Sequence, residues 1–198
     1  MSISQRIQSQ FAGSIATKQA AVDAMTAPIE AAIRLMAASL RAGGKVMACG
    51  NGGSAASASH FVTDLGKGAS DKLPRPFRCL SINDNTPWIT ALGNDYAYDQ
   101  VFAKQVSALG RAGDVLLAIS TSGNSPNVIA ALQVAHERGV HVVALTGKGG
   151  GKMNELMGAG DVHLCVPAER TARIQEVHLL TLHCLCDGID ALILGETP

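Results

Sequence analysis

The segment Asp114–Asn127, with the sequence DVLLAISTSGNSPN, constrains the fold more than any other part of the chain. It opens with the apolar run Val115–Ile119, which is typical of a strand buried on both faces of a parallel sheet. A polar turn follows, and from Val128 the apolar residues recur at helical spacing. The segment therefore predicts a strand, a hydroxyl-rich turn and a helix in direct succession.

The predicted turn carries four hydroxyl side chains at the start of the predicted helix: Ser120, Thr121, Ser122 and Ser125. A helix N-terminus favours an anion because its first N–H groups are free and its dipole is positive there. The hydroxyl groups add neutral donors, which suit a phosphate better than a carboxylate. One or two such residues would be ordinary turn and cap residues. The run of them favours a phosphate site.

The rest of the chain repeats the alternation of apolar strand and helix, which indicates an α/β fold with a five-stranded parallel sheet. We expect the flavodoxin-like order 2-1-3-4-5, in which the first and third strands flank the topological switch point. The turns that follow these two strands, at 50–54 and 120–125, should therefore meet. The expected strands cover 45–50, 77–82, 114–120, 140–146 and 162–166.

Residues 1–40 show helical spacing, and we expect them to form a long N-terminal arm that packs on a partner subunit, with a second helix starting at Pro28. Residues 41–198 form the α/β domain. At 198 residues and 47% hydrophobic content, the chain is long enough for one well-buried domain, and two would be cramped.

Composition argues against several classes of partner. The chain has 16 basic and 16 acidic residues and shows no basic patch, so neither nucleic acid nor an anionic membrane surface is expected to bind. At 4%, aromatic residues are too sparse for base stacking. No leader sequence or membrane-spanning stretch is evident. The five cysteines form no regularly spaced set, which favours reduced thiols and a cytoplasmic location.

Two glycine-rich segments suggest other functions. Residues 50–55 match G-x-G-x-x-A, but Asp84 follows 34 residues after Gly50 rather than about 20, which weakens a dinucleotide-binding fingerprint. The loop 147–153, GKGGGKM, resembles a phosphate-binding loop only loosely, because it lacks the spacing and the hydroxyl that would hold magnesium. We expect it to be a flexible connection.

With these motifs in view, the chain resembles the sugar isomerase (SIS) domain proteins and, among them, the phosphoheptose isomerases. The resemblance runs through nearly the whole chain from about residue 40. Its strongest motifs are CGNGGSA (49–55), HFVTDL (60–65), LGNDY (92–96), STSGNSPNVI (120–129) and RIQEVHLLTLH (173–183). It implies the flavodoxin-like SIS fold and a homotetramer built through the N-terminal helices.

The resemblance also implies an aldose–ketose isomerase. The reaction would convert sedoheptulose 7-phosphate to a heptose 7-phosphate, an early step towards bacterial surface polysaccharides. Asp64 and His183 would be the acid/base pair, and one zinc ion per subunit would be bound by His60, Asp64, Gln175 and His183. The phosphate would be held by Ser120, Thr121, Ser122 and Ser125, and the remaining substrate contacts would come from Asn51, Gly52, Gly53, Asn94, Asp95 and Gln175.

The residue chemistry is compatible with these roles. Isomerisation through an enediol needs a base on one face of the sugar and stabilisation of a developing oxyanion. His60 and Asp64 are four residues apart, so they share one face of a predicted helix. Gln175 and His183 lie about two turns apart on the predicted C-terminal helix, which extends over 174–194. Nitrogen and oxygen ligands with an open position suit catalytic zinc.

Asp64 departs from the resemblance, since the family usually carries a glutamate there. Its carboxylate should be withdrawn by about 1.5 Å, one single bond, relative to a glutamate. Residues 65–72, LGKGASDK, also differ from the usual continuation. An alternative function is a non-enzymatic adaptor, because related proteins that bind the bacterial replication initiator lack the acid/base pair. The carboxylate at Asp64 and the imidazole at His183 favour the enzyme.

Overall fold

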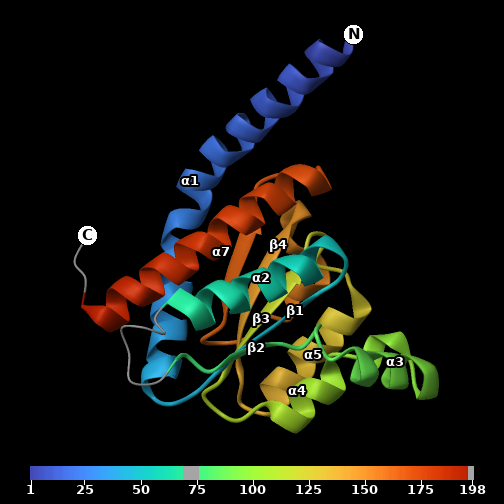
Figure 1. The fold of residues 1–198 in the computed structure, drawn as a ribbon, viewed down its shortest axis with the longest axis vertical. Helices are drawn as coiled ribbons and strands as arrows, with labels where there is room; N and C mark the ends of the chain where they lie inside the picture. The colour runs from blue at the N-terminus through green and yellow to red at the C-terminus, as the bar shows by residue number, and fades with distance from the viewer. Residues whose placement is uncertain (69–75, 196–198) are drawn as a thin grey trace.

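The computed structural model describes residues 1–68 and 76–195. Residues 69–72, from the segment that differs from the family's usual continuation, therefore lie outside the described residues. A parallel sheet forms the middle layer of the fold (Figure 1), and its strand order is β2-β1-β3-β4-β5, as predicted. The strands are β1 (Val46–Gly50), β2 (Cys79–Ser81), β3 (Val115–Ser120), β4 (His141–Gly147) and β5 (Val162–Val166).

Helices cover both faces of this sheet (Figure 1). Along β1, Val46 and Ala48 pack into the core beneath α1, α2 and α7, whereas Met47 and Cys49 pack into the core beneath α3, α4 and α5. Both faces are therefore dry, which explains the continuous apolar runs. The helices are α1 (Ile3–Arg41), α2 (Gly53–Gly68), α3 (Thr86–Asp95), α4 (Ala103–Leu109), α5 (Pro126–Glu137), α6 (Gly151–Glu155) and α7 (Thr171–Leu194), with 3-10 turns η1 (Tyr98–Gln100) and η2 (Lys148–Gly150).

The N-terminal helix α1 is continuous over 39 residues and contains Pro28, so the prediction of a second helix starting at Pro28 was wrong. Proline removes one helical hydrogen bond. The packing of Met25, Ala32 and Met36, all buried in the core, holds the helix together across that point. The first half of α1 projects beyond the domain as an arm (Figure 1).

The C-terminal helix α7 is, among the described residues, the one helix long and apolar enough to cross a membrane by length and composition. Its apolarity has a local cause. Ile174, Leu182 and Leu185 are buried in the core, and α7 packs along α1 and α2. Leu179 and Leu180 remain exposed on its outer face. The helix thus serves as a core element with a second apolar face still open.

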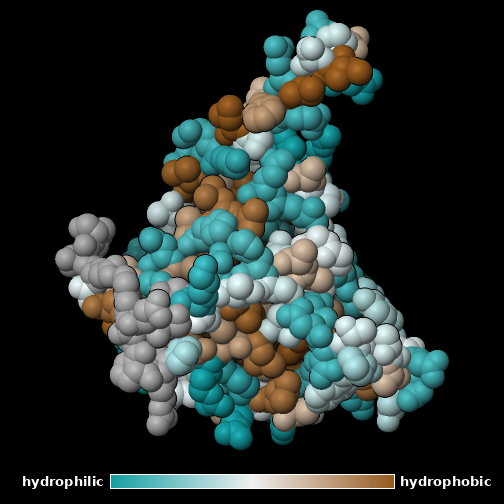
Figure 2. Space-filling model, viewed as in Figure 1, coloured by the Kyte–Doolittle hydropathy of each residue, from teal (hydrophilic) through white to brown (hydrophobic). Residues whose placement is uncertain are grey.

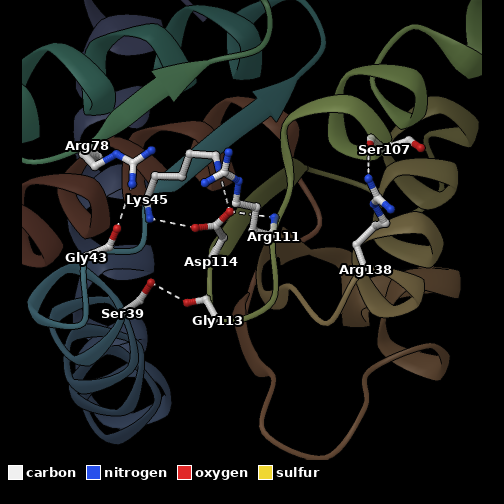
Figure 3. Close-up of polar contacts among 9 residues, drawn as sticks. All are labelled: Ser39, Gly43, Lys45, Arg78, Ser107, Arg111, Gly113, Asp114 and Arg138. Atoms are coloured by element: carbon white, nitrogen blue, oxygen red, sulfur yellow. Dashed lines mark hydrogen bonds and ion pairs between the residues drawn. The ribbon is translucent and has the colours of Figure 1, made fainter.

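At the amino edge of the sheet, a buried ion pair fixes the starts of β1 and β3 (Figure 3). The Asp114 carboxylate accepts hydrogen bonds from the Lys45 ammonium group, the Lys45 backbone N–H (2.9 Å) and the Arg111 backbone N–H (2.8 Å). Such a carboxylate is fully satisfied, which offsets the cost of burying it. The carboxyl edge, where the predicted site lies, is thus presented by a fixed pair of strands.

Candidate active site

The turns after β1 and β3 meet at the switch point, as predicted. The Asn51 side chain, from the first turn, donates through Nδ2 to Oδ1 of Asn127 at 2.8 Å. Asn127, in the first turn of α5, donates back through its own Nδ2 to Oδ1 of Asn51, also at 2.8 Å. Because β1 and β3 are adjacent and parallel, both turns leave the same edge of the sheet. The two candidate loops thus form one continuous polar surface.

The hydroxyl turn is built into the fold. Ser120 is 3% exposed, and its Oγ lies 2.9 Å from Oγ of Ser125. Ser125 occupies the N-cap position of α5, yet its side chain makes no capping hydrogen bond, because its hydroxyl pairs with Ser120 instead. Thr121 and Ser122 are half-buried in the same turn. The predicted phosphate ligands therefore gather at the N-terminus of a twelve-residue helix, where an anion is favoured.

The glycine-rich loop is ordered against this turn, so the expectation of a flexible connection was wrong. Gly123 has φ +64°, and a Cβ there would lie 1.8 Å from the carbonyl oxygen of Gly150. Its carbonyl accepts the Met153 N–H at 3.0 Å, and Asn124 Oδ1 accepts the Lys152 N–H at 3.0 Å. On the loop side, Gly151 has φ +51°, and a Cβ there would lie 2.5 Å from the Ser122 carbonyl oxygen, so glycine is required where the two backbones touch. The loop therefore braces the hydroxyl turn.

An open cavity of about 440 Å³ adjoins the two turns, lined by Asn51, Ala97, Tyr98, Asp99, Ser125, Pro126 and Asn127. The predicted pair Asn94 and Asp95 lies at the exposed end of α3, where Asn94 Nδ2 donates to Asp95 Oδ1 at 2.8 Å. The next residues, 97–99, form the cavity wall. The sequence reasoning missed Asn127, Tyr98 and Asp99. For Asn127, the available signal was a polar side chain directly after the hydroxyl turn.

The first turn of α2 touches the start of α7. A Cβ on Gly53 would lie 2.7 Å from Nε2 of Gln175, so glycine is needed for this side chain to pack there. Further along, the Cys186 thiol lies 4.0 Å from the Phe61 carbonyl oxygen. The two helices therefore run side by side in the same direction. Gln175 lies at the end of this pair that faces the polar turns.

His60, Asp64 and His183 form a cluster midway along the same helix pair. Asp64 Oδ2 lies 3.0 Å from His60 Nε2 and 3.4 Å from His183 Nδ1. The two imidazole rings are edge to face, with centroids 5.1 Å apart. The shorter aspartate thus reaches both rings in spite of its missing methylene. The three side chains are 45%, 36% and 51% exposed, which leaves the cluster open to solvent or a partner.

One atom from each of these three side chains lies within 4.8 Å of the others, which is close enough for the group to hold a metal ion. Tetrahedral zinc with ligands at about 2.0–2.1 Å places them about 3.3 Å apart, so a small closure would suffice. Two imidazoles and a carboxylate are suitable zinc ligands and leave a position open. Gln175, the fourth predicted ligand, is eight residues from His183, or about 12 Å along the helix.

The groups next to the cluster do not add a nucleophile. Burial raises the pKa of the Cys186 thiol to about 12, and the carboxylates of Asp64 and Asp190 act in the same direction. The thiol stays protonated at neutral pH, and a protonated thiol is a poor nucleophile and a poor ligand. His178, on the buried face of α7, bonds the Thr146 carbonyl oxygen at 2.9 Å. The cluster therefore remains the candidate for acid/base chemistry.

Comparison with known proteins agrees with this geometry. Residues 10–147 match the SIS domain family. The chain is 60% identical to the phosphoheptose isomerase of Azoarcus sp. (strain BH72), covering 98% of both chains, and 53% identical to that of Dechloromonas aromatica (strain RCB), covering 98% and 99%.

Solved structures give the same result. The phosphoheptose isomerase from Neisseria gonorrhoeae is 48% identical with a TM-score of 0.91, over 96% of this chain and 100% of that one. The enzyme from Francisella tularensis is 40% identical with a TM-score of 0.93, over 96% and 99%. Full-length identity of this order, with the same fold, is decisive. The chain belongs to the SIS-domain family and, within it, to the phosphoheptose isomerases.

Proposed function

We propose that this protein isomerises sedoheptulose 7-phosphate to D-glycero-D-manno-heptose 7-phosphate. The observation that carries the proposal is the contact of Asp64 with both His60 and His183 in a chain of this family. Aldose–ketose isomerisation needs a positioned base and acid, and a carboxylate beside an imidazole supplies both. The product would enter the synthesis of bacterial surface polysaccharides. We place the protein in the cytoplasm, where its five free cysteines would stay reduced.

In this mechanism Asp64 and His183 move the proton. One takes the proton from the carbon next to the carbonyl, and an enediol forms as the carbonyl oxygen gains a proton. The same groups then give a proton to C2, the former carbonyl carbon, and take the proton from the C1 hydroxyl, so that the ketone is replaced by an aldehyde at C1. A positioned acid or base contributes about 10²- to 10⁴-fold to such a step. The 3.4 Å contact between the two side chains lets them act on adjacent atoms of one sugar.

The polar turns bind the substrate. Ser120, Thr121, Ser122 and Ser125 would hold the phosphate at the N-terminus of α5, where the free N–H groups favour it. Asn51, Gly52 and Gly53 would contact the sugar, together with Gln175, which packs against Gly53. Asn94 and Asp95 would reach it from the exposed end of α3, beyond the cavity wall. These assignments divide the site into a phosphate end and a reacting end.

A zinc ion, one per subunit, fits the cluster. We assign His60, Asp64 and His183 as its ligands. Gln175 lies about 12 Å along α7 from His183, so as the fourth ligand it would come from a neighbouring subunit. When bound there, zinc would polarise sugar oxygens and stabilise the charge that develops on them. The chain's own contribution is to hold both imidazoles against one carboxylate and to leave the reacting face open. Metal analysis of the purified protein, compared with His60→Ala, tests this assignment, which predicts loss of zinc in the variant.

We further propose a homotetramer assembled through α1. The projecting arm exposes an apolar stripe along one side, Ile3, Ile7, Phe11 and Ile15, each more than half exposed (Figure 2). Exposed apolar surface of this extent marks an interface. An apolar groove between α1 and α7, which includes Val22, Met25 and Leu180, continues it. Phe11→Asp should yield smaller oligomers with unchanged helix content, measured by light scattering and circular dichroism.

A neighbouring subunit would also complete each site. His60 and Asp64 lie seven and eleven residues beyond Gly53, about 10 and 16 Å along α2. An extended seven-carbon sugar phosphate spans on the order of 10 Å, given single bonds near 1.5 Å. The turns and the cluster of one chain are thus at the limit of what one substrate can bridge. If the turns of one subunit faced the cluster of a neighbour, the substrate would not have to bridge this distance. The exposure of the cluster is consistent with such an arrangement.

Co-expression of two impaired variants, assayed at a substrate concentration well below KM, tests the sharing of sites. Ser120→Ala removes a phosphate ligand and His183→Ala removes a catalytic group. Random mixing restores roughly a quarter of the sites if the turn and the cluster come from different subunits, because both intact parts can then meet. If one subunit supplies both, each site keeps one defect and activity stays at the level of the variants.

The direct test of the function is incubation of the purified protein with sedoheptulose 7-phosphate, with and without zinc, and detection of the aldose product. Conversion is expected. Lack of conversion in both conditions would favour the second candidate, an adaptor for the replication initiator, which would retain the fold and the sugar pocket without the chemistry. Asp64→Asn serves as the inactive control.

A further inference from the structure

Asn127 is a buried polar residue for which the proposed binding and catalytic roles give no function. It is 2% exposed, lies in the first turn of α5, and forms part of the cavity wall beside Ser125. Both heteroatoms of its side-chain amide are engaged by one partner, Asn51, in the two 2.8 Å hydrogen bonds that join the turns. A buried amide whose oxygen and nitrogen both pair with one neighbouring side chain controls how that side chain is oriented.

The reciprocal pair fixes the Asn51 amide in one orientation. A side-chain amide has two N–H groups and one oxygen with two lone pairs. Asn51 uses one N–H and one lone pair on Asn127, and the second N–H and the second lone pair remain available. A sugar hydroxyl that both accepts and donates hydrogen bonds can use both. Without Asn127 the amide is free to rotate about its side-chain bonds.

Other contacts already hold the backbones of the two turns. Asn83 clamps Gly50, since its Oδ1 accepts the Gly50 N–H at 3.1 Å and its Nδ2 donates to the Gly50 carbonyl at 2.7 Å. The hydroxyl turn is held by the Ser120–Ser125 contact and by the glycine-rich loop. The feature that depends on Asn127 is therefore the direction of the Asn51 side chain.

We infer that Asn127 is a positioning residue that locks the Asn51 amide across the switch point, so that a sugar anchored by its phosphate presents its hydroxyls to a preset amide. The inference rests on the proposed function and deepens it. Sugar recognition and phosphate anchoring then depend on different residues of the same cavity. Loss of Asn127 should affect the first and spare the second.

The test is a double-mutant cycle with Asn51→Ala and Asn127→Ala, scored by kcat/KM for sedoheptulose 7-phosphate. Each single variant should lower kcat/KM about tenfold, because the sugar loses its hydrogen bonds to a fixed Asn51 amide in either case. The double variant should also lose about tenfold rather than about a hundredfold, because the two residues act as one unit. The inhibition constant of inorganic phosphate should stay within about twofold in all three variants.

Two further variants separate positioning from loss of stability. Asn127→Leu keeps nearly the same shape without the polar atoms and should reproduce the effect of Asn127→Ala. Gln105→Leu is the matched control, since Gln105 is also 2% exposed and donates two amide hydrogen bonds, to Ile82 and Val101, outside the cavity lining. It should lower the melting temperature and leave kcat/KM within about twofold.

Effects that multiply in the double variant would overturn the inference. So would a parallel loss of phosphate affinity, since that would give Asn127 a structural role in the hydroxyl turn. A wild-type protein that turns over no sugar phosphate would contradict the proposed function alone. In that case the affinity for the same sugar phosphate, measured by calorimetry, replaces kcat/KM in the cycle. Multiplying effects in the double variant, or a parallel loss of phosphate affinity, would again overturn the inference.

Discussion

The hydroxyl turn and the histidine–aspartate cluster are built in opposite ways. Ser120 is 3% exposed and paired within its own turn, while His183 and His60 have side chains that are 51% and 45% exposed. The turn is fixed by the sheet edge and the glycine-rich loop. The cluster rests on the outer surfaces of two helices. The hydroxyl turn is thus held in place by contacts within one chain, whereas the cluster is open enough to accept a metal ion, a substrate or a neighbouring subunit.

The largest expected effect comes from the open cluster. His183→Ala should lower kcat about a thousandfold, because it removes an acid/base group, and should leave the melting temperature unchanged, because the side chain is half exposed. His136→Ala is a matched control, since His136 is also partly exposed and bonds Asp161 away from the cluster. Steady-state kinetics and thermal unfolding of both variants measure the contrast. Retained turnover in His183→Ala would remove the cluster from the mechanism.

A second prediction concerns the buried face of the same helix. Burial lowers the pKa of His178 to about 4, against the opposing effect of its bond to the Thr146 carbonyl. In the unfolded chain the pKa is near 6.5, so between pH 6.5 and 4 the unfolded state binds the extra proton. Stability should therefore be complete above pH 6.5 and fall by about 3 kcal/mol as the pH drops to 4.

Urea unfolding at several pH values measures this loss. His178→Gln, which cannot take up the proton, should flatten the dependence, whereas His183→Ala should leave it in place. A wild-type stability that does not change between pH 6.5 and 4 would contradict the burial of a neutral imidazole on this face. His178 and His183 would then differ in their position on α7 but not in how their protonation affects stability.

Two glycine variants test how rigidly the turn is built. Gly123 and Gly43 both have positive φ, at +64° and +82°, but a Cβ meets the Gly150 backbone at the first and nothing within 4 Å at the second. Gly43→Ala should cost about 1 kcal/mol of backbone strain. Gly123→Ala should cost about 2–3 kcal/mol and also weaken inhibition by inorganic phosphate. Equal costs would show that the glycine-rich loop does not brace the turn.

The smallest expected effect is the loss of one phosphate ligand. Ser120→Ala should raise KM for the sugar phosphate about tenfold with kcat within about twofold, because one hydrogen bond to a charged group is worth about 1.5 kcal/mol. Ser59→Ala is a suitable control, since the Ser59 hydroxyl donates to Oδ1 of Asp84 and does not line the cavity. A fall in kcat at unchanged KM would place Ser120 at the reacting end.

The sequence predicted the parts of the structure that local patterns determine. The strand order follows from the alternation of strands and helices, and the helix Pro126–Glu137 follows from apolar periodicity that begins at Val128. The switch-point rule places Asn51 beside the hydroxyl turn. The wrong predictions concern long-range packing. Pro28 lies inside α1 because distant core contacts outweigh its local cost, and the glycine-rich loop is ordered because it touches Gly123.

In the candidate site, too, local patterns predicted some features, and others depend on long-range packing. The spacing of His60 and Asp64 predicts a shared helix face, and the structure adds the contact with His183 from another helix. The pairing of Asn127 with Asn51 could not be predicted, since it depends on the direction of two side chains across 76 residues. The placement of residues 97–99 in the cavity wall, beyond Asn94, likewise depends on how α3 ends.

The most direct test of the acid/base assignment is isomerisation in deuterium oxide, followed by NMR of the product. Asp64 and His183 are partly exposed, so a proton that they remove can exchange with solvent before it is returned. The account predicts a product with deuterium at the carbon that receives the proton, and neither product nor exchange with Asp64→Asn. A product formed without deuterium would indicate direct hydrogen transfer between the two carbons and would contradict the assigned roles of Asp64 and His183.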